Sequence, residues 1–153
     1  MALAMDLGNL PANILTPIFL ENAAKQVGKN YPSLNVESLD FESIKKMGMG
    51  AFHAVAKGDP DMTARMIVVK YSGGKEGDAP YAFVGKGITF DSGGVSIKPS
   101  ENMHEMKYDM MGAATVLGLL SIVAELEIPI NVVGVMACTP NLPDGLATLP
   151  GDV

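Results

Sequence analysis

The sequence has 153 residues, enough for one domain with a hydrophobic core, and hydrophobic residues make up 48% of it. With 18% charged residues and a mean hydropathy of +0.23, this composition excludes an intrinsically disordered chain. Seventeen acidic residues against eleven basic ones give a net charge of −6, which argues against a nucleic-acid-binding protein and suits a site that gathers carboxylates around cations.

The first half of the chain predicts four short segments. Thr16 and Pro17 are residue types that begin helices, at the N-cap and at the first helical position. Gly48 is placed to end a helix. The predicted segments are a loop over 9–17, a helix from there to Tyr31, a strand over 34–39 and a helix over 41–47.

The second half predicts a strand, a long loop, a helix and a strand, which together form a right-handed crossover in a parallel sheet. The strand over 81–84 is almost continuously apolar, as buried strands are. The predicted segments are strands over 65–71, 81–84 and 131–137, a surface loop over 72–78, a connection over 85–107 and a helix over 109–126. We therefore predict an α/β fold with a mainly parallel sheet flanked by helices, and ligands at the loops that follow the strands.

Several features predict a soluble protein of the cytoplasm. Cys138 is the single cysteine, so it forms no internal disulfide and fits a reducing compartment. The first residues lack the basic region of a signal peptide, and Asp6 interrupts them. The longest apolar run, 113–124, is shorter than the roughly 20 residues that a membrane span requires.

The connection contains Asp91-Ser92-Gly93-Gly94, which raises the question of a serine nucleophile. Such a serine needs a histidine base, and the only histidines are His53 and His104. Phe90 stands where the G-x-S-x-G elbow requires glycine. The glycines also match no phosphate-binding pattern. We expect the serine to be a spacer.

A metal site uses more of these residues. Lys86 follows a strand, Asp91 comes five residues later, and Asp109 lies where the next helix is expected to begin. Carboxylate oxygens suit Mn²⁺ and Zn²⁺, whereas a lysine amine binds a metal only after losing its proton. Residue types alone leave alternatives open: Lys86 as a solvated strand-end lysine, Asp109 as a helix N-cap and Lys98 as an exposed loop charge.

Longer runs add a resemblance to the leucyl aminopeptidase (cytosol aminopeptidase) family. Residues 84–94, V-G-K-G-I-T-F-D-S-G-G, carry its central motif. Shorter runs are also similar: S-I-K-P-S at 96–100, M-K-Y-D-M at 106–110, D-L-G-N-L-P-A-N at 6–13 and P-G-D-V at 150–153. The resemblance covers essentially the whole chain.

The resemblance implies a zinc-exopeptidase-like fold and a metal-dependent aminopeptidase that releases N-terminal residues, often leucine, from peptides. Two divalent ions, Mn²⁺ or Zn²⁺, and a hexameric assembly are implied for the full-length family member. By position, Lys86 resembles a lysine ligand, Asp91 the aspartate that bridges both metals and Asp109 a further ligand. Lys98 resembles the catalytic lysine, and Met106 lies where the family binds the first side chain of the substrate.

The sequence also departs from the family pattern. No stretch of residues 1–153 matches the N-T-D-A-E-G-R-like block, which supplies two further carboxylates and an arginine in the family, and we expect these residues to exclude the family's separate N-terminal domain. Leu149 stands where arginine is common, and Met111 where cysteine is common. We therefore expect residues 1–153 to be the N-terminal part of the catalytic domain, incomplete at its C-terminal side and inactive alone. The alternative is a non-catalytic truncated relative that acts as a binding or assembly module.

Overall fold

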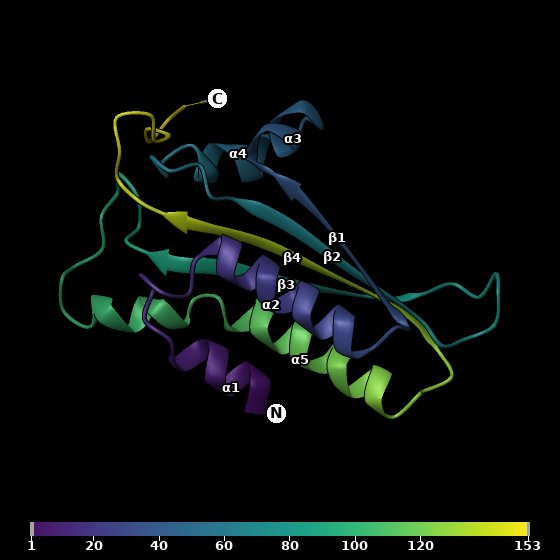
Figure 1. The fold of residues 1–153 in the computed structure, drawn as a ribbon. Helices are drawn as coiled ribbons and strands as arrows, with labels where there is room; N and C mark the ends of the chain where they lie inside the picture. Colours follow the sequence, from purple (N-terminus) through teal and green to yellow (C-terminus); the bar gives the residue numbers. More distant parts are fainter. Residues whose placement is uncertain (1, 153) are drawn as a thin grey trace.

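A four-stranded sheet organises residues 2–152, the part of the chain that the computed structural model describes. The sheet has the strand order β1-β2-β4-β3, and Figure 1 shows how the helices surround it. The strands are β1 Leu34–Asp40, β2 Arg65–Ser72, β3 Tyr81–Asp91 and β4 Asn131–Asn141. The helices are α1 Ala2–Asn9, α2 Pro17–Asn30, α3 Phe41–Lys46, α4 Gly50–Ala56, the 3-10 helix η1 Met103–Tyr108 and α5 Met111–Glu125.

The α/β class with flanking helices is confirmed, but the sheet is mixed rather than mainly parallel. Strand β3 pairs with β4 in parallel, as the predicted crossover requires, whereas β1 with β2 and β2 with β4 are antiparallel. The connection 73–80 between β2 and β3 is shorter than the dozen or so residues that a parallel crossover needs. Strand β3 therefore runs opposite to β2, and β4 is inserted between them.

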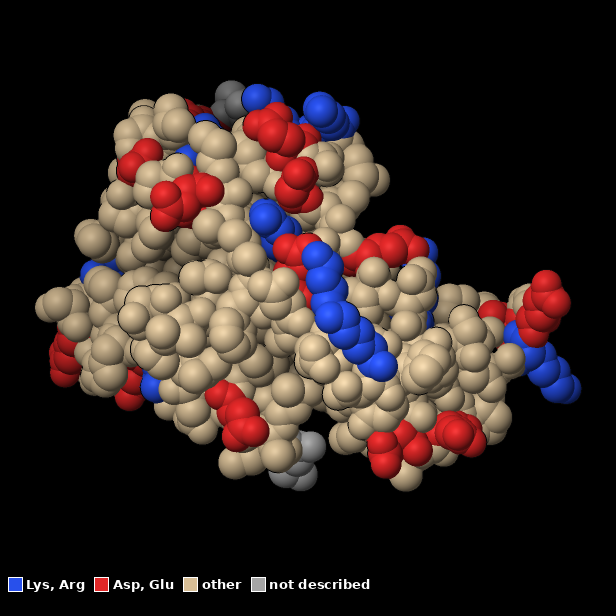
Figure 2. Space-filling view, in the orientation of Figure 1, with Lys and Arg blue, Asp and Glu red and all other residues tan. Residues whose placement is uncertain are grey.

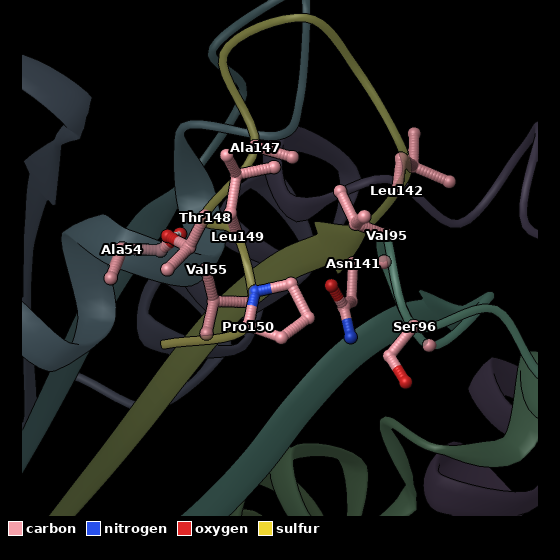
Figure 3. A pocket seen from close by; sticks show the side chains of 12 residues that line it. Ala54, Val55, Val95, Ser96, Asn141, Leu142, Ala147, Thr148, Leu149 and Pro150 are labelled. Atoms are coloured by element: carbon pink, nitrogen blue, oxygen red, sulfur yellow. Dashed lines mark hydrogen bonds between the residues drawn. The ribbon is translucent and has the colours of Figure 1, made fainter. Parts of the chain in front are cut away.

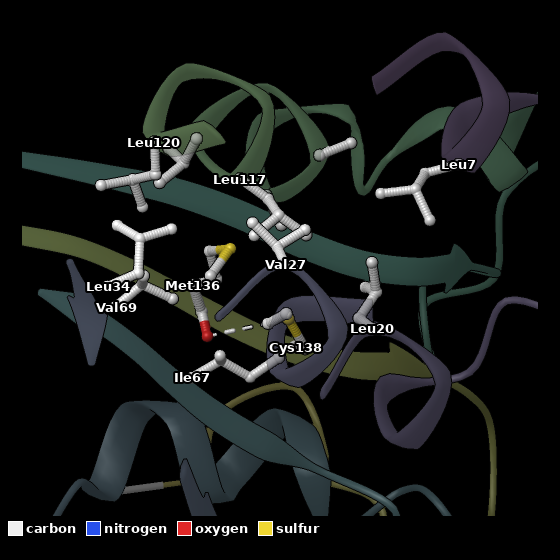
Figure 4. Close-up of a cluster of buried hydrophobic side chains, with 14 of the residues drawn as sticks. Leu7, Leu20, Val27, Leu34, Ile67, Val69, Leu117, Leu120, Met136 and Cys138 are labelled. Atoms are coloured by element: carbon white, nitrogen blue, oxygen red, sulfur yellow. Dashed lines mark hydrogen bonds between the residues drawn. The ribbon is translucent and has the colours of Figure 1, made fainter. Parts of the chain in front are cut away.

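One face of the sheet carries the main core. Helices α1, α2 and α5 cover this face, whereas α3 and α4 lie near one end of the sheet (Figure 1). Figure 4 shows side chains of α2 and α5 pointing toward those of the strands, among them Leu20, Leu120 and Val69, all nearly inaccessible to solvent. A smaller buried cluster lies at α3 and α4 around Phe41 and Ile44.

Helix α2 begins as predicted, since Thr16 Oγ1 accepts a hydrogen bond from the Phe19 backbone N–H at 3.2 Å. Helices α1 and α4 were not predicted. Helix α4 begins at Gly50 without a side-chain cap, so its start carries none of the residue types that signal a helix N-terminus.

Strand β3 differs most from the prediction. It continues from Tyr81 to Asp91, so the predicted connection from Gly85 onward is partly strand. Its first half was predicted to be buried but is exposed, with Val84 78% accessible and Tyr81 62% accessible. In the described residues β3 is an edge strand, so no neighbouring strand covers these side chains.

Acidic and basic side chains are interspersed on the face of the molecule drawn in Figure 2.

The stretch Met103–Glu125, which joins η1 and α5, meets the length and composition of a membrane span, and half of its most apolar part is buried. Core helices of globular proteins commonly meet the same criterion, and α5 packs against the sheet.

Glu21 connects helix α2 to the neighbouring strands through a buried carboxylate. Its Oε1 accepts hydrogen bonds from Lys25 Nζ at 2.5 Å and Ser38 Oγ at 2.6 Å, and its Oε2 accepts one from Arg65 Nε at 2.7 Å. Burial by itself would raise the pKa of Glu21, but these donors outweigh it and lower the pKa from 4.5 to about 2. The ionised carboxylate therefore stabilises the folded chain.

We predict that Glu21→Gln destabilises the chain by roughly 2–3 kcal/mol at neutral pH. Because the folded-state pKa is the lower one, the stabilisation is complete above about pH 4.5 and is lost as the pH falls toward 2. Urea unfolding at pH 7 and at pH 3 measures the difference. Glu37→Gln, in an exposed pair with Lys70, is the control and should change the stability little. An equal effect of both substitutions would contradict the prediction.

Candidate functional site

Strand β3 and helix α5 touch backbone to backbone at two glycines. A Cβ atom on Gly85 would lie 2.6 Å from the Gly112 carbonyl oxygen, and a Cβ on Gly112 would lie 2.7 Å from the Lys86 nitrogen. No side chain fits in either place, so both positions need glycine. This contact brings the start of α5, with Asp109 just before it, next to Lys86.

A β-bulge near the end of β3 determines the side to which Asp91 points. Ile88 pairs with Thr139 and Asp91 pairs with Asn141, so three steps along β3 match two along β4. Side chains alternate along a strand, and the odd spacing from Lys86 to Asp91 would place the two side chains on opposite faces. The extra residue of the bulge restores them to the same face.

The predicted site residues form two ion pairs. The ammonium group of Lys86 donates a short hydrogen bond to the Asp109 carboxylate, and Lys98 Nζ lies 3.1 Å from Asp91 Oδ2. The structure therefore brings Lys86 together with Asp109 and Lys98 together with Asp91. Within residues 2–152, no hydrogen bond or ion pair joins one pair to the other.

Asp109 does not cap the following helix, although its place in the sequence allowed that interpretation. Helix α5 begins at Met111 and has no side-chain cap. The Asp109 backbone N–H instead donates to the Met106 carbonyl at 3.3 Å, which closes the end of η1. The Asp109 carboxylate is thus free of a capping role and faces Lys86.

The Asp91 carboxylate is held by donors on both oxygens. Its Oδ1 accepts hydrogen bonds from the Asn141 side-chain amide at 2.8 Å and from the Gly93 backbone N–H at 3.0 Å. Partial burial would raise the pKa of Asp91, but the hydrogen bonds from Lys98, Gly93 and Asn141 outweigh it and hold the pKa below its ordinary value. Asp91 therefore stays ionised at neutral pH.

Ser92 has a structural role in the loop. Its hydroxyl donates to the Asn141 carbonyl oxygen at 2.7 Å and accepts from the Gly94 N–H at 3.2 Å, and the residue is 5% exposed. Neither histidine serves it as a base: His53 packs on Phe41 with ring centroids 5.0 Å apart, and His104 is exposed on η1. The interpretation of the serine as a spacer agrees with this geometry.

The donor chemistry of these residues fits a divalent cation in part. Two carboxylates and a lysine amine are ligand types that Mn²⁺ and Zn²⁺ accept. Among residues 2–152, however, no group of three or more His, Cys, Asp or Glu side chains converges on one point. Cys138 adds no ligand, because burial raises the pKa of its thiol to about 12. The described residues therefore supply part of a ligand set.

Two hollows lie near the Lys98–Asp91 pair. One, of about 450 Å³, is lined by Lys98 and Met106 together with the start of η1. The other, of about 380 Å³, lies between α4 and the loops that follow β3 and β4, and Figure 3 shows Val55, Val95 and Asn141 at its wall. The predicted catalytic lysine and the predicted substrate-contacting methionine thus border the same space.

Comparison with known proteins identifies the fold and motif. The sequence profile described as "Cytosol aminopeptidase family, catalytic domain" matches residues 2–153. The chain belongs to the cytosol aminopeptidase family. Probable cytosol aminopeptidases from Alkalilimnicola ehrlichii and Azotobacter vinelandii are 54% and 56% identical to it over all 153 residues. The chain spans 31% of the length of these curated relatives.

Two solved structures have a similar fold. The crystal structure of the cytosol aminopeptidase from Coxiella burnetii matches 99% of the chain with a TM-score of 0.90 and 31% identity. The bottromycin maturation enzyme BotP, solved in complex with Mn, matches 99% of it with a TM-score of 0.88 and 36% identity. The chain covers 32% of each of these structures.

Sequence reasoning missed Asn141, which touches Asp91 more closely than any predicted residue does. Asn141 follows Thr139-Pro140 in a stretch rich in proline and glycine, and the predicted strand ended at 137. Strand β4 instead continues to Asn141. The family likeness of the surrounding residues was the one available signal.

We predict that Gly112→Ala destabilises the chain by roughly 1–3 kcal/mol, because the added methyl group forces α5 away from β3. Gly118→Ala, in the same helix, is the matched control. Its Cβ would meet Ala4 at 3.5 Å, an ordinary contact, and the better helix propensity should add up to about 1 kcal/mol. Thermal unfolding of both variants tests the close contact, and equal stability of the two would contradict it.

Proposed function

We propose that residues 1–153 are the N-terminal part of the catalytic domain of a metal-dependent aminopeptidase that releases N-terminal residues, often leucine, from peptides in the cytoplasm. The observation that carries the proposal is the pairing of four motif residues at β3, namely Lys86 with Asp109 and Lys98 with Asp91. Because the chain spans 31% of its relatives, the remaining ligands and the arginine would come from residues outside this range.

Lys86, Asp91 and Asp109 would hold part of a pair of divalent ions, Mn²⁺ or Zn²⁺. When bound, such ions polarise the peptide carbonyl and activate a water molecule. The Mn complex of BotP, which is 36% identical to this chain, supports a divalent metal. Asp91 contributes a carboxylate that is already ionised, since its donors lower its pKa.

Lys98 would bind the carbonyl oxygen of the scissile peptide bond. Its side chain is 38% exposed and borders the hollow at η1, so a substrate can reach the ammonium group. The charge that develops on the carbonyl oxygen is stabilised by a cation fixed beside it. Met106 lines the same hollow and would contact the first side chain of the peptide, which accounts for a preference for apolar residues such as leucine.

We predict that the purified 153-residue chain hydrolyses a leucyl anilide at a negligible rate in Mn²⁺. A chimera tests the residues themselves: residues 2–152 replace the matching third of the Azotobacter vinelandii relative. In the chimera, Lys98→Met should lower kcat by about 10²–10³-fold, because the developing oxyanion loses its cation. Asp78→Asn, in an exposed loop, is the control and should leave kcat unchanged. Full activity of the Lys98→Met chimera, or brisk hydrolysis by the isolated chain, would refute the assignment.

A second candidate function is a non-catalytic assembly module. The exposed apolar edge of β3, with Tyr81, Phe83 and Val84, favours it, because an uncovered strand edge pairs readily with another chain. The two candidates are compatible with a homo-oligomer, such as the hexamer expected of a full-length family member. They differ in whether the two ion pairs, Lys86 with Asp109 and Lys98 with Asp91, have a chemical role.

We predict that the isolated chain self-associates through this edge and that Val84→Lys reduces the association. Sedimentation velocity at increasing protein concentration measures the change. Leu126→Lys is the control, since Leu126 is 65% exposed at the far end of α5 and lies on no strand edge. A chain that stays monomeric without substitution would contradict the prediction.

A further inference from the structure

Asn141, the last residue of β4, is hydrogen-bonded to Asp91 at the end of β3 and to Ser92, which begins the following loop. Its backbone carbonyl oxygen accepts hydrogen bonds from the Ser92 N–H at 3.0 Å and from the Ser92 hydroxyl at 2.7 Å. Its side-chain amide donates to Asp91 Oδ1 at 2.8 Å. The backbone and the side chain of one residue therefore hold two successive residues, the last of β3 and the first of the loop after it.

The two kinds of contact have different sequence requirements. Any residue at position 141 would supply the carbonyl oxygen that anchors Ser92, so the loop is held without the amide. The amide contact depends on asparagine, and it is directed at the carboxylate alone. The need to anchor the loop therefore does not explain why residue 141 is an asparagine.

Gly94 leaves the space that the Asn141 side chain occupies. A Cβ atom at Gly94 would lie 2.9 Å from Asn141 Oδ1, and Gly94 has φ +73°, a conformation that glycine adopts readily. The loop thus turns sharply at Gly94, and the absence of a side chain there leaves room for the Asn141 amide. The packing around position 141 is arranged so that the amide reaches Asp91.

The two oxygens of the Asp91 carboxylate have different hydrogen-bond partners. Oδ1 accepts from the neutral donors of Asn141 and Gly93, whereas Oδ2 faces the Lys98 ammonium at 3.1 Å. A carboxylate held at one oxygen cannot rotate freely, so the direction of the other oxygen is fixed. Ligands whose outer hydrogen bonds fix their orientation bind metals more tightly.

We propose that Asn141 is a positioning residue that orients the Asp91 carboxylate for a divalent cation. The inference rests on the metal role proposed above for Asp91. It adds a residue outside the ligand set, which acts through Asp91 and not by touching the cation or the substrate.

Mn²⁺ binding by the 153-residue chain tests the inference, with the free aquo ion measured by electron paramagnetic resonance. Binding that Asp91→Asn abolishes defines the site. Asn141→Leu keeps the shape of the side chain and removes its donors, so it should weaken Asp91-dependent binding by about 10–100-fold. Circular dichroism shows whether each variant is folded.

Asn131→Leu is the matched control. Asn131 lies at the other end of β4, and its side chain makes three hydrogen bonds to the loop 74–78, at 3.0, 3.1 and 3.0 Å. Its loss should lower the stability while leaving Mn²⁺ binding unchanged. A merely structural role of Asn141 would give the same result for both variants.

Each result has one interpretation. Weaker binding in Asn141→Leu alone supports the inference. Unchanged binding in Asn141→Leu, or equal weakening in Asn131→Leu, overturns it and leaves the metal site standing. Absence of Asp91-dependent binding in the unsubstituted chain overturns the proposed metal role of Asp91, and the inference about Asn141 with it.

Discussion

The contact between Gly85 and Gly112 is the constraint on which the rest of the site depends. Helix α5 approaches β3 so closely that backbone meets backbone. This approach determines where the chain leaves η1, and so it places the Asp109 carboxylate beside Lys86. A third glycine, Gly134 on β4, continues the contact under α5, where a Cβ atom would lie 2.5 Å from Leu120. The helix thus lies flat along two parallel strands, and the core and the charged residues are positioned by the same packing.

The ion pairs show how the arrangement proposed to bind metal can be stable without a bound ion. Each of the two carboxylates has a lysine as its partner, so neither negative charge is left uncompensated. A half-buried carboxylate without a partner would be costly. The lysines compensate these charges in the described residues, and all four partners are residues to which the family likeness gives chemical roles. Stability and chemistry therefore draw on the same side chains.

Much of this could be predicted from the sequence, and the gaps have physical causes. The alanine- and leucine-rich helix, the crossover to β4 and the charged residues of the motif were all evident from pattern or likeness. The antiparallel pairing of β1 with β2 and of β2 with β4 could not be predicted. Strand direction depends on connection lengths and strand partners, which a local sequence pattern does not encode. The exposure of Val84 was missed because an apolar strand looks the same at an edge as in the middle of a sheet. Asn141 was missed because the predicted strand ended at 137, before Pro140, whereas a strand tolerates proline where the ladder needs no donor.

The bulge in β3 has a consequence for how such chains can diverge. Because it sets which face Asp91 occupies, the number of residues between Lys86 and Asp91 matters as much as their identity. Substitutions at the intervening positions alter packing locally, whereas the loss or gain of one residue there would turn the carboxylate into the opposite layer of the protein. The segment 86–91 should therefore tolerate substitutions far better than changes of length. Selection should remove insertions and deletions within it before it removes substitutions.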